Sequence, residues 1–206
     1  MKVICIGRNY VDHATELGNA VPEEPIFFLK PETAVVYPGK PVKLPTNLGE
    51  IHHELEVVIA IDGYGKDIPA NMALGFVGWY TLGLDLTARA VQNELKAKGL
   101  PWEKAKAFDG SAVIGDVALP LAAGMDLLSN SIELKRNGAT VQEARTRDMI
   151  FPVAELIAHV SRYMTLEPGD LLYTGTPAGV GPMAPGDVFE GFMDGKRLLN
   201  VAVAKG

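Results

Sequence analysis

The chain of 206 residues carries a formal net charge of −6, and 48% of its residues are hydrophobic while 21% are charged. This balance predicts one soluble domain over residues 1–206 with a sizeable core, and the acidity argues against nucleic acid as a partner, because phosphate binding needs a basic face. Cys5 is the single cysteine and no apolar run approaches the roughly 18 residues of a membrane span, so we expect a cytoplasmic protein without disulfides or a membrane partner.

The N-terminal segment predicts a strand followed by a short helix. Residues 2–7, "KVICIG", have the apolar run of a buried strand. Asn9 is a candidate N-cap for a helix over residues 10–17, and Gly18 is a candidate stop. This places the polar residues of "YVDHATEL" on a helix close to the start of the chain.

The central segment predicts two long strands and a second helix. Residues 51–61 and 76–87 are rich in β-branched and aromatic residues. Thr87 is a candidate N-cap for a helix over residues 88–98, which Gly99 would end.

The C-terminal segment predicts hairpins around one further helix. The pairs Asn137-Gly138 and Asp194-Gly195 have the composition of tight hairpin turns. A helix is expected to start at Pro152, because apolar residues then recur at helical spacing. These residues are Val153, Leu156, Ile157, Val160 and Met164. With roughly ten strands, three short helices and no βαβ alternation, the pattern favours a mostly β, α+β fold over a doubly wound sheet.

Two glutamates on the first long strand raise a question of charge. Strand side chains alternate between faces, so Glu54 and Glu56 would share one face and repel each other. A bound cation removes that conflict, and Asp85 near the end of the next strand supplies a third carboxylate. Three carboxylates favour a hard metal such as Mg²⁺, Mn²⁺ or Ca²⁺. Two other interpretations stay open: a solvated E-x-E face, and for Asp85 a helix N-terminal charge.

Three further stretches carry polar groups. His13 and Glu16 are three residues apart on a predicted helix, where the carboxylate could orient the imidazole as a base; an incidental exposed pair is the alternative. Lys106 lies between aromatic residues in "WEKAKAF"; a lone lysine in such a segment is normally exposed to solvent. Residues 173–182, "YTGTPAGVGP", could offer backbone N–H groups to an anion or form an ordinary surface turn; they lack the Lys-Ser/Thr ending of a nucleotide-binding loop.

The order and spacing of six segments resemble the fumarylacetoacetate hydrolase superfamily, in particular its short acylpyruvase and oxaloacetate decarboxylase branch. The segments are "GRNYVDHATELG", "EEPIFFLKPETA", "HHELEVVIAI", "LDLTARAVQ", "GLPWEKAKAFDGS" and "LLYTGTPAGVGP", which span residues 7–182. The resemblance implies a mixed β-sandwich-like roll with a few short helices, a homodimer and a divalent metal, with Mg²⁺ expected and Mn²⁺ or Ca²⁺ as alternatives. Ala90 departs from the aspartate that many members carry.

The resemblance also implies roles for individual residues. It implies three metal ligands, a His–Glu pair on a lid that activates water, a lysine that binds the substrate and stabilises an enolate, and three further substrate contacts. The residues at matching positions are, in that order, Glu54, Glu56 and Asp85; His13 and Glu16; Lys106; and Gln92, Arg89 and Thr176.

The expected reaction is cleavage of a carbon–carbon bond in an acylpyruvate, a 2,4-diketo acid such as acetylpyruvate or a fumarylpyruvate-like compound, to pyruvate and a carboxylate. We prefer hydrolysis because the His–Glu pair is intact. Oxaloacetate decarboxylation passes through the same enolate and needs no attacking water, and isomerisation or hydration of a related 2-keto acid would use the same metal. A metal-stabilised β-domain that binds keto acids or a partner protein is the non-catalytic alternative.

Overall fold

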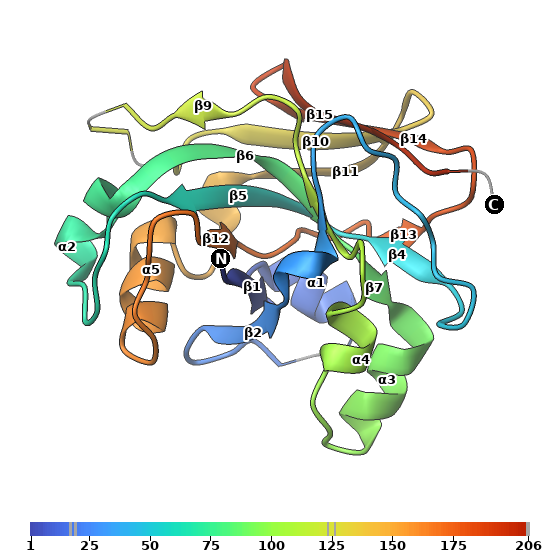
Figure 1. The fold of residues 1–206 in the computed structure, drawn as a ribbon, viewed down its shortest axis with the longest axis horizontal. Helices are drawn as coiled ribbons and strands as arrows, with labels where there is room; N and C mark the ends of the chain where they lie inside the picture. The colour runs from blue at the N-terminus through green and yellow to red at the C-terminus, as the bar shows by residue number, and fades with distance from the viewer. Residues whose placement is uncertain (17, 19, 123, 126, 205–206) are drawn as a thin grey trace.

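Strands dominate the computed structural model, which describes residues 1–16, 18, 20–122, 124–125 and 127–204. Figure 1 shows a large curled sheet crossed by a smaller sheet, with the helices arranged around the large sheet. The prediction of a mostly β fold with a few short helices is confirmed. Within the described residues, no helix combines the length and apolar character that crossing a membrane needs.

Among the described residues, the strands form three sheets. The largest has the spatial order β2 (Ile26–Lys30), β1 (Val3–Gly7), β12 (Leu171–Tyr173), β5 (Leu55–Ile61), β6 (Val77–Asp85), β8 (Ala112–Ile114) and β3 (Val35–Val36), with β9 (Leu119–Pro120) paired to β6. The second has the order β11 (Ala139–Arg145), β10 (Ser131–Arg136), β14 (Val188–Met193) and β15 (Lys196–Ala202). The third joins β13 (Gly181–Pro182), β4 (Ile51–His53) and β7 (Thr87–Ala88).

The helices are short. They are α1 (Val11–Glu16), α2 (Ala70–Ala73), α3 (Arg89–Ala97), α4 (Glu103–Lys106) and α5 (Val153–Ser161), with the 3₁₀ turns η1 (Glu32–Ala34), η2 (Leu74–Phe76) and η3 (Thr146–Asp148). In Figure 1, α3 and α4 lie together below the ends of the central strands, and α1 lies beside them. Helices α3 and α4 contact each other and β7 (Thr87–Ala88), which follows β6 closely in the chain.

The core explains why β5 is apolar on both faces. Val57 and Ile59 face the main core, which also contains Phe189 of the second sheet and Leu156 of α5. Val58 faces the other way, into a smaller cluster with Val3 and Tyr173. Because strand side chains alternate, a strand covered on both faces needs apolar residues at successive positions.

Both predicted hairpin turns are confirmed. Asn137 and Gly138 have φ of 51° and 83° between β10 and β11, and Asp194 and Gly195 have φ of 48° and 76° between β14 and β15. Positive φ at both central positions is the requirement of a type I′ turn, which Asn, Asp and Gly satisfy at low cost.

The first predicted helix is shorter than expected and is not capped by Asn9. Helix α1 begins at Val11, and Gly18 with φ of 63° follows it as predicted; Leu17 lies outside the described residues. The Asn9 amide binds two distant segments: Nδ2 donates to Phe151 O at 3.0 Å and to Thr174 O at 2.8 Å. Tertiary hydrogen bonds therefore replace the expected cap.

Two other boundaries were predicted wrongly. Helix α3 begins at Arg89 without a side-chain cap, because Thr87 pairs with His52 in the third sheet. Helix α5 ends at Ser161, so Met164 lies beyond it, although Met164 still packs against the core.

The strand predicted over residues 51–61 is broken at Glu54. Residues on its N-terminal side form β4 in the third sheet, and those on its C-terminal side form β5 in the large sheet. His52 on β4 has its Nε2 2.7 Å from Oε1 of the exposed Glu50. The break places Glu54 at the junction of two sheets.

Candidate metal centre and pocket

Three buried carboxylates meet at the ends of β5 and β6. Glu54 precedes β5, Glu56 is its second residue, and Asp85 is the last residue of β6. The antiparallel pairing holds them together, since Asp85 N donates to Glu54 O at 2.9 Å. One carboxylate oxygen of each lies within 4.8 Å of the others. Their exposed fractions are 4%, 1% and 1%, so the interpretation of Glu54 and Glu56 as a solvated face is wrong.

Buried cations surround these carboxylates. Arg89 Nη2 lies 2.5 Å from Glu54 Oε1, and Lys106 Nζ lies 2.7 Å from both Glu54 Oε2 and Asp85 Oδ2. Lys30 Nζ forms an ion pair of 2.6 Å with Asp85 Oδ1. Asp85 is thus held by two lysines at the end of β6, which excludes its interpretation as a helix N-terminal charge.

The charges act differently on the two glutamates. Burial alone would raise the pKa of Glu54, but Lys106 and Arg89 outweigh it and hold that pKa well below its usual range. Burial, together with repulsion from Asp85 and Glu54, raises the pKa of Glu56 well above its usual range. The amide N–H of Gly175, 2.6 Å from Glu56 Oε2, acts in the opposite direction.

The donor set fits a divalent cation that prefers oxygen ligands. Glu54, Glu56 and Asp85 offer three convergent carboxylates, which suit Mg²⁺, Mn²⁺ or Ca²⁺ better than zinc or copper. Ionised Glu56 is disfavoured beside the other two carboxylates, and a bound cation would stabilise it. None of these three donors is a thiolate, the ligand type that softer metals prefer.

Lys106 is not solvated. It belongs to α4, its exposed fraction is 3%, and its Nζ lies 5.3 Å from the centroid of the Phe28 ring. Burial acts to lower the pKa of Lys106, but Asp85 and Glu54 outweigh it and raise that pKa. The ammonium therefore stays charged in the pocket at neutral pH.

The His13–Glu16 pair lies on α1 at the edge of the same pocket. His13 Nδ1 is 3.3 Å from Glu16 Oε2, and the Glu16 carboxylate accepts a hydrogen bond from Gly179 N at 3.1 Å. His13 is 5% exposed whereas Glu16 is exposed, so the imidazole of this pair is enclosed and its carboxylate partner is not. Burial lowers the pKa of His13, against the opposite effects of Glu54 and Glu16. A neutral imidazole held through Nδ1 is suited to act as a base through Nε2.

The Gly-rich turn over residues 173–182 binds anions of this chain. Gly175 N donates to Glu56 and Gly179 N donates to Glu16, so one turn contacts both the carboxylate cluster and the His13–Glu16 pair. Thr176 between them is 3% exposed and lines the pocket. The turn is therefore a part of the site, and the surface-turn interpretation is wrong.

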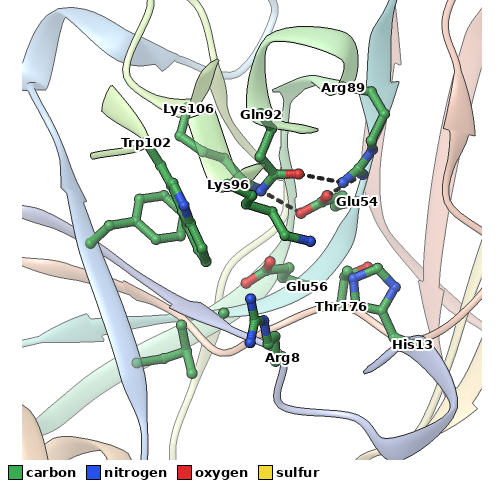
Figure 2. A pocket seen from close by; sticks show the side chains of 13 residues that line it. Arg8, His13, Glu54, Glu56, Arg89, Gln92, Lys96, Trp102, Lys106 and Thr176 are labelled. Carbon is green, nitrogen blue, oxygen red and sulfur yellow. Dashed lines mark hydrogen bonds and ion pairs between the residues drawn. The ribbon is translucent and has the colours of Figure 1, made fainter. Parts of the chain in front are cut away.

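One face of α3 lines the opposite side of the pocket. Arg89, Gln92 and Lys96 recur at helical spacing on this face, and Arg89 Nη1 donates to Gln92 Oε1 at 2.6 Å. Figure 2 shows these side chains above Glu54 and Glu56, with Arg8 and His13 on the other side of the cavity.

The structure brings all nine predicted site residues together. Seven line the pocket directly. The other two contact a lining residue: Asp85 forms an ion pair with Lys106, and Glu16 contacts His13. The seven are His13, Glu54, Glu56, Arg89, Gln92, Lys106 and Thr176.

Four charged or amide side chains at the site were not predicted. Arg8 and Lys96 line the pocket, Lys30 pairs with Asp85, and Gln142 of β11 binds Thr176. Lys96 follows Gln92 by one helical turn, a signal that helix periodicity could have provided. Arg8 lies inside the segment "GRNY" that the resemblance already included. Lys30 likewise lies inside the segment "EEPIFFLKPETA" that the resemblance included, whereas Gln142 carries no local signal.

Comparisons with known proteins identify the family of this chain. The fumarylacetoacetate (FAA) hydrolase C-terminal family matches residues 2–203. The mitochondrial oxaloacetate tautomerase FAHD1 of Arabidopsis thaliana is 45% identical over 185 residues, which cover 90% of this chain and 82% of that protein. A mitochondrial oxaloacetate decarboxylase of Dictyostelium discoideum is 44% identical over 192 residues, covering 92% and 87%.

A solved structure gives the same result. The fumarylpyruvate hydrolase of Pseudomonas aeruginosa in complex with Mn²⁺ and pyruvate superposes with a TM-score of 0.92 at 39% identity, covering 100% of this chain and 90% of that chain. The family named by the resemblance is confirmed by sequence and by structure. The chain belongs to the fumarylacetoacetate hydrolase family.

Proposed function

We propose that this protein is a divalent-cation-dependent enzyme that interconverts the keto and enol forms of oxaloacetate. The observation that carries the proposal is one pocket that holds a carboxylate cluster for the cation, the charged Lys106 and the neutral base His13. The tautomerase and decarboxylase relatives support oxaloacetate as substrate. They favour the isomerase and decarboxylase alternatives at least as strongly as the hydrolysis expected from the sequence.

The chain's residues have separate tasks in this reaction. Glu54, Glu56 and Asp85 would hold Mg²⁺ or Mn²⁺, which when bound supplies a Lewis acid for the oxygens of the 2-oxo acid. Gln92 is fixed by its hydrogen bond to Arg89, so its amide nitrogen is free to orient the substrate carboxylate. Pairing with Glu54 keeps the Arg89 guanidinium rigid.

The reaction itself is a transfer of one proton. His13 takes a proton from C3 of oxaloacetate, and the electron pair moves to form the C2–C3 double bond. The Lys106 ammonium donates a hydrogen bond to the oxygen on C2, where negative charge develops. The proton is then returned to that oxygen, which gives the enol without change in composition or oxidation state. Glu16 keeps the proton of neutral His13 on Nδ1, so Nε2 is the accepting atom.

Hydrolysis of an acylpyruvate is a second candidate, and the His13–Glu16 pair with its Gly179 contact favours it. His13 would take a proton from water, whose oxygen attacks the distal carbonyl. The carbon–carbon bond then breaks to give a carboxylic acid and the enol of pyruvate. The fumarylpyruvate hydrolase structure supports this candidate.

The test follows two products in parallel. Protein treated with EDTA and then supplied with Mg²⁺ or Mn²⁺ is mixed with oxaloacetate or acetylpyruvate. Ultraviolet absorbance follows the enol, and a coupled dehydrogenase detects pyruvate. We expect faster approach to the keto–enol equilibrium of oxaloacetate when the metal is present, without pyruvate above the spontaneous rate.

Other outcomes assign other reactions. Pyruvate from acetylpyruvate would establish the hydrolase, and metal-dependent pyruvate from oxaloacetate would establish the decarboxylase. Unchanged keto–enol kinetics would refute the tautomerase proposal. Association of two chains stays a prediction, which light scattering on the purified protein tests.

A further inference from the structure

Arg8 has a backbone conformation that needs an explanation. It follows β1 with φ of 59°, in the left-handed region that residues other than glycine rarely adopt. The next residue, Asn9, is held in place by hydrogen bonds to Phe151 and Thr174. Strained backbone held by its surroundings is found preferentially at functional sites, and Arg8 lines the pocket that contains Glu54 and Glu56.

The guanidinium of Arg8 is supported from one side and directed into the cavity. It lies 5.8 Å from the centroid of the Trp102 ring, a geometry that favours a cation over an aromatic face. Lys96 reaches the same cavity from α3, on the helix face that carries Arg89 and Gln92. Figure 2 shows the tips of Arg8 and Lys96 approaching each other from opposite walls.

Arg89 and Lys106 form a second group of cations in the same pocket, next to the carboxylates. Arg89 and Lys106 are paired with Glu54 at 2.5 Å and 2.7 Å and belong to the metal site. Burial lowers the pKa of Lys96, and repulsion from Arg8 and Arg89 adds to this effect. Two half-buried cations, Arg8 directly after β1 and Lys96 on α3, thus converge on the space next to the carboxylate cluster. An anionic group placed there would be attracted by both.

We propose that Arg8 and Lys96 bind the second carboxylate of a dicarboxylic 2-oxo acid, and that they make this enzyme selective for dianionic over monoanionic substrates. The assignment of the 2-oxo acid end to the carboxylate cluster rests on the proposed function. The distal carboxylate then lies on the Trp102 side of the pocket, where a planar guanidinium can donate two parallel hydrogen bonds. Oxaloacetate meets this requirement and acetylpyruvate does not.

The test compares two stable acids of the same length. Calorimetry on Mn²⁺-loaded protein measures the Kd of 2-oxoglutarate and of 2-oxopentanoate, which has a methyl group where the other has the distal carboxylate. The parent protein should bind the diacid about tenfold more tightly or better, because hydrogen bonds to charged groups contribute appreciably to binding. Arg8→Met and Lys96→Met should each reduce this preference and leave the Kd of 2-oxopentanoate unchanged.

Matched controls separate charge from folding. Lys98→Met removes an exposed cation from the same helix, where Lys98 pairs with Glu94, and should leave both affinities unchanged. Arg8→Lys keeps the charge and loses the planar fork, so it should retain part of the preference. Should Arg8→Met fold poorly by circular dichroism, Lys96→Met decides the outcome, because Lys96 lies on a regular helix.

The two proposals can fail separately. Equal binding of both acids by the parent, or an equal loss for both acids in the variants, would overturn the role of Arg8 and Lys96 whatever the enzyme catalyses. A preference for the diacid without any effect on the keto–enol kinetics of oxaloacetate would overturn the proposed reaction and support the carboxylate site.

Discussion

Gln142 Nε2 donates a hydrogen bond of 2.9 Å to Thr176 Oγ1, which connects β11 of the second sheet to the pocket. The same amide nitrogen donates to Pro177 O at 3.0 Å. Its oxygen accepts from Leu55 N at 2.9 Å and lies 3.1 Å from His53 Nδ1. Thr176 Oγ1 accepts from Gln142 and donates a long hydrogen bond of 3.4 Å to Pro177 O, so a bound substrate can take over its hydroxyl proton.

Replacing Gln142 should therefore affect both stability and binding. Gln142→Met leaves the buried N–H of Leu55 without its acceptor, and we expect a loss of about 1–3 kcal/mol in the free energy of unfolding, measured by urea denaturation. The affinity for pyruvate should also fall, since Thr176 is no longer oriented. Glu143→Gln on the same strand is exposed and serves as the control.

A double-mutant cycle tests whether Gln142 acts through Thr176. In a Thr176→Val background, Gln142→Met should cause no further loss of pyruvate affinity, because the hydroxyl that it orients has been removed. Additive losses would show that Gln142 supports the pocket by another route.

Metal binding can be separated from ion pairing with two isosteric changes. Asp85→Asn leaves Lys30 and Lys106 with one fewer buried partner, so we expect a loss of about 3–5 kcal/mol in stability together with weaker Mn²⁺ binding. Glu56→Gln should abolish tight Mn²⁺ binding and leave the metal-free protein at least as stable as the parent, because its ionised form is already disfavoured. Calorimetry and thermal melts in EDTA measure both effects, with the exposed Asp116→Asn as control.

The pH dependence of the metal-free protein follows from the same groups. The pKa of Glu56 is raised above its ordinary 4.5, so stability falls as the pH rises from about that value through the folded pKa. The pKa of Glu54 is lowered below its ordinary 4.5. Its ionised form therefore stabilises the folded protein above pH 4.5, and this stabilisation is lost as the pH falls through the folded pKa.

Cation binding below the raised pKa of Glu56 should therefore release a proton from its carboxyl group. Calorimetric titration with Mn²⁺ in buffers of different ionisation enthalpy measures the number of protons released. Release that persists in Glu56→Gln would contradict this assignment.

Protonation of His13 should cause the loss of activity at acidic pH. Its pKa lies below the ordinary 6.5, so the neutral base is present at pH 7 and activity should fall only as the pH drops through the lowered value. His13→Asn should lower kcat by about 10²- to 10⁴-fold and remove this limb. His52→Asn, outside the pocket lining, is the control; a His13→Asn enzyme with parental kcat would exclude His13 as the base.

Gly175 connects backbone conformation to the metal site. Its φ is +97°, and an added Cβ would lie 2.6 Å from Asn9 Cβ. Gly175→Ala should displace the N–H that binds Glu56 and weaken Mn²⁺ binding. Gly169 has φ of +91° and nothing within 4 Å of an added Cβ, so Gly169→Ala measures the backbone strain alone. Equal melting temperatures and equal Mn²⁺ affinities for the two variants would refute the role of the close contact.

Several features follow from neighbouring residues and were predictable from the sequence. Asn137-Gly138 and Asp194-Gly195 form their turns because few residue pairs accept positive φ at both positions. Glu54 and Glu56 converge in one carboxylate cluster, as strand alternation predicts, although the strand itself breaks at Glu54. His13 contacts Glu16 because residues three apart meet on a helix. The resemblance placed Asp85, Lys106, Gln92, Arg89 and Thr176 in the same site.

Other features were decided by the tertiary structure. Residues 51–53 and 87–88 pair in a separate sheet, which breaks the expected strand at Glu54 and removes Thr87 from its capping role. Asn9 binds Phe151 and Thr174 far along the chain.

The tertiary structure also decides which residues the functional side chains contact. Lys30 reaches Asp85 from β2, Gln142 reaches Thr176 from β11, and Arg8 faces the pocket through a strained φ. Their chemistry is visible in the sequence, but their partners are not, because a buried charge or amide takes whichever complementary group the packing brings within hydrogen-bonding distance. The sequence by itself determined the local geometry and the types of functional group, and the packing of the three sheets decided which of them meet.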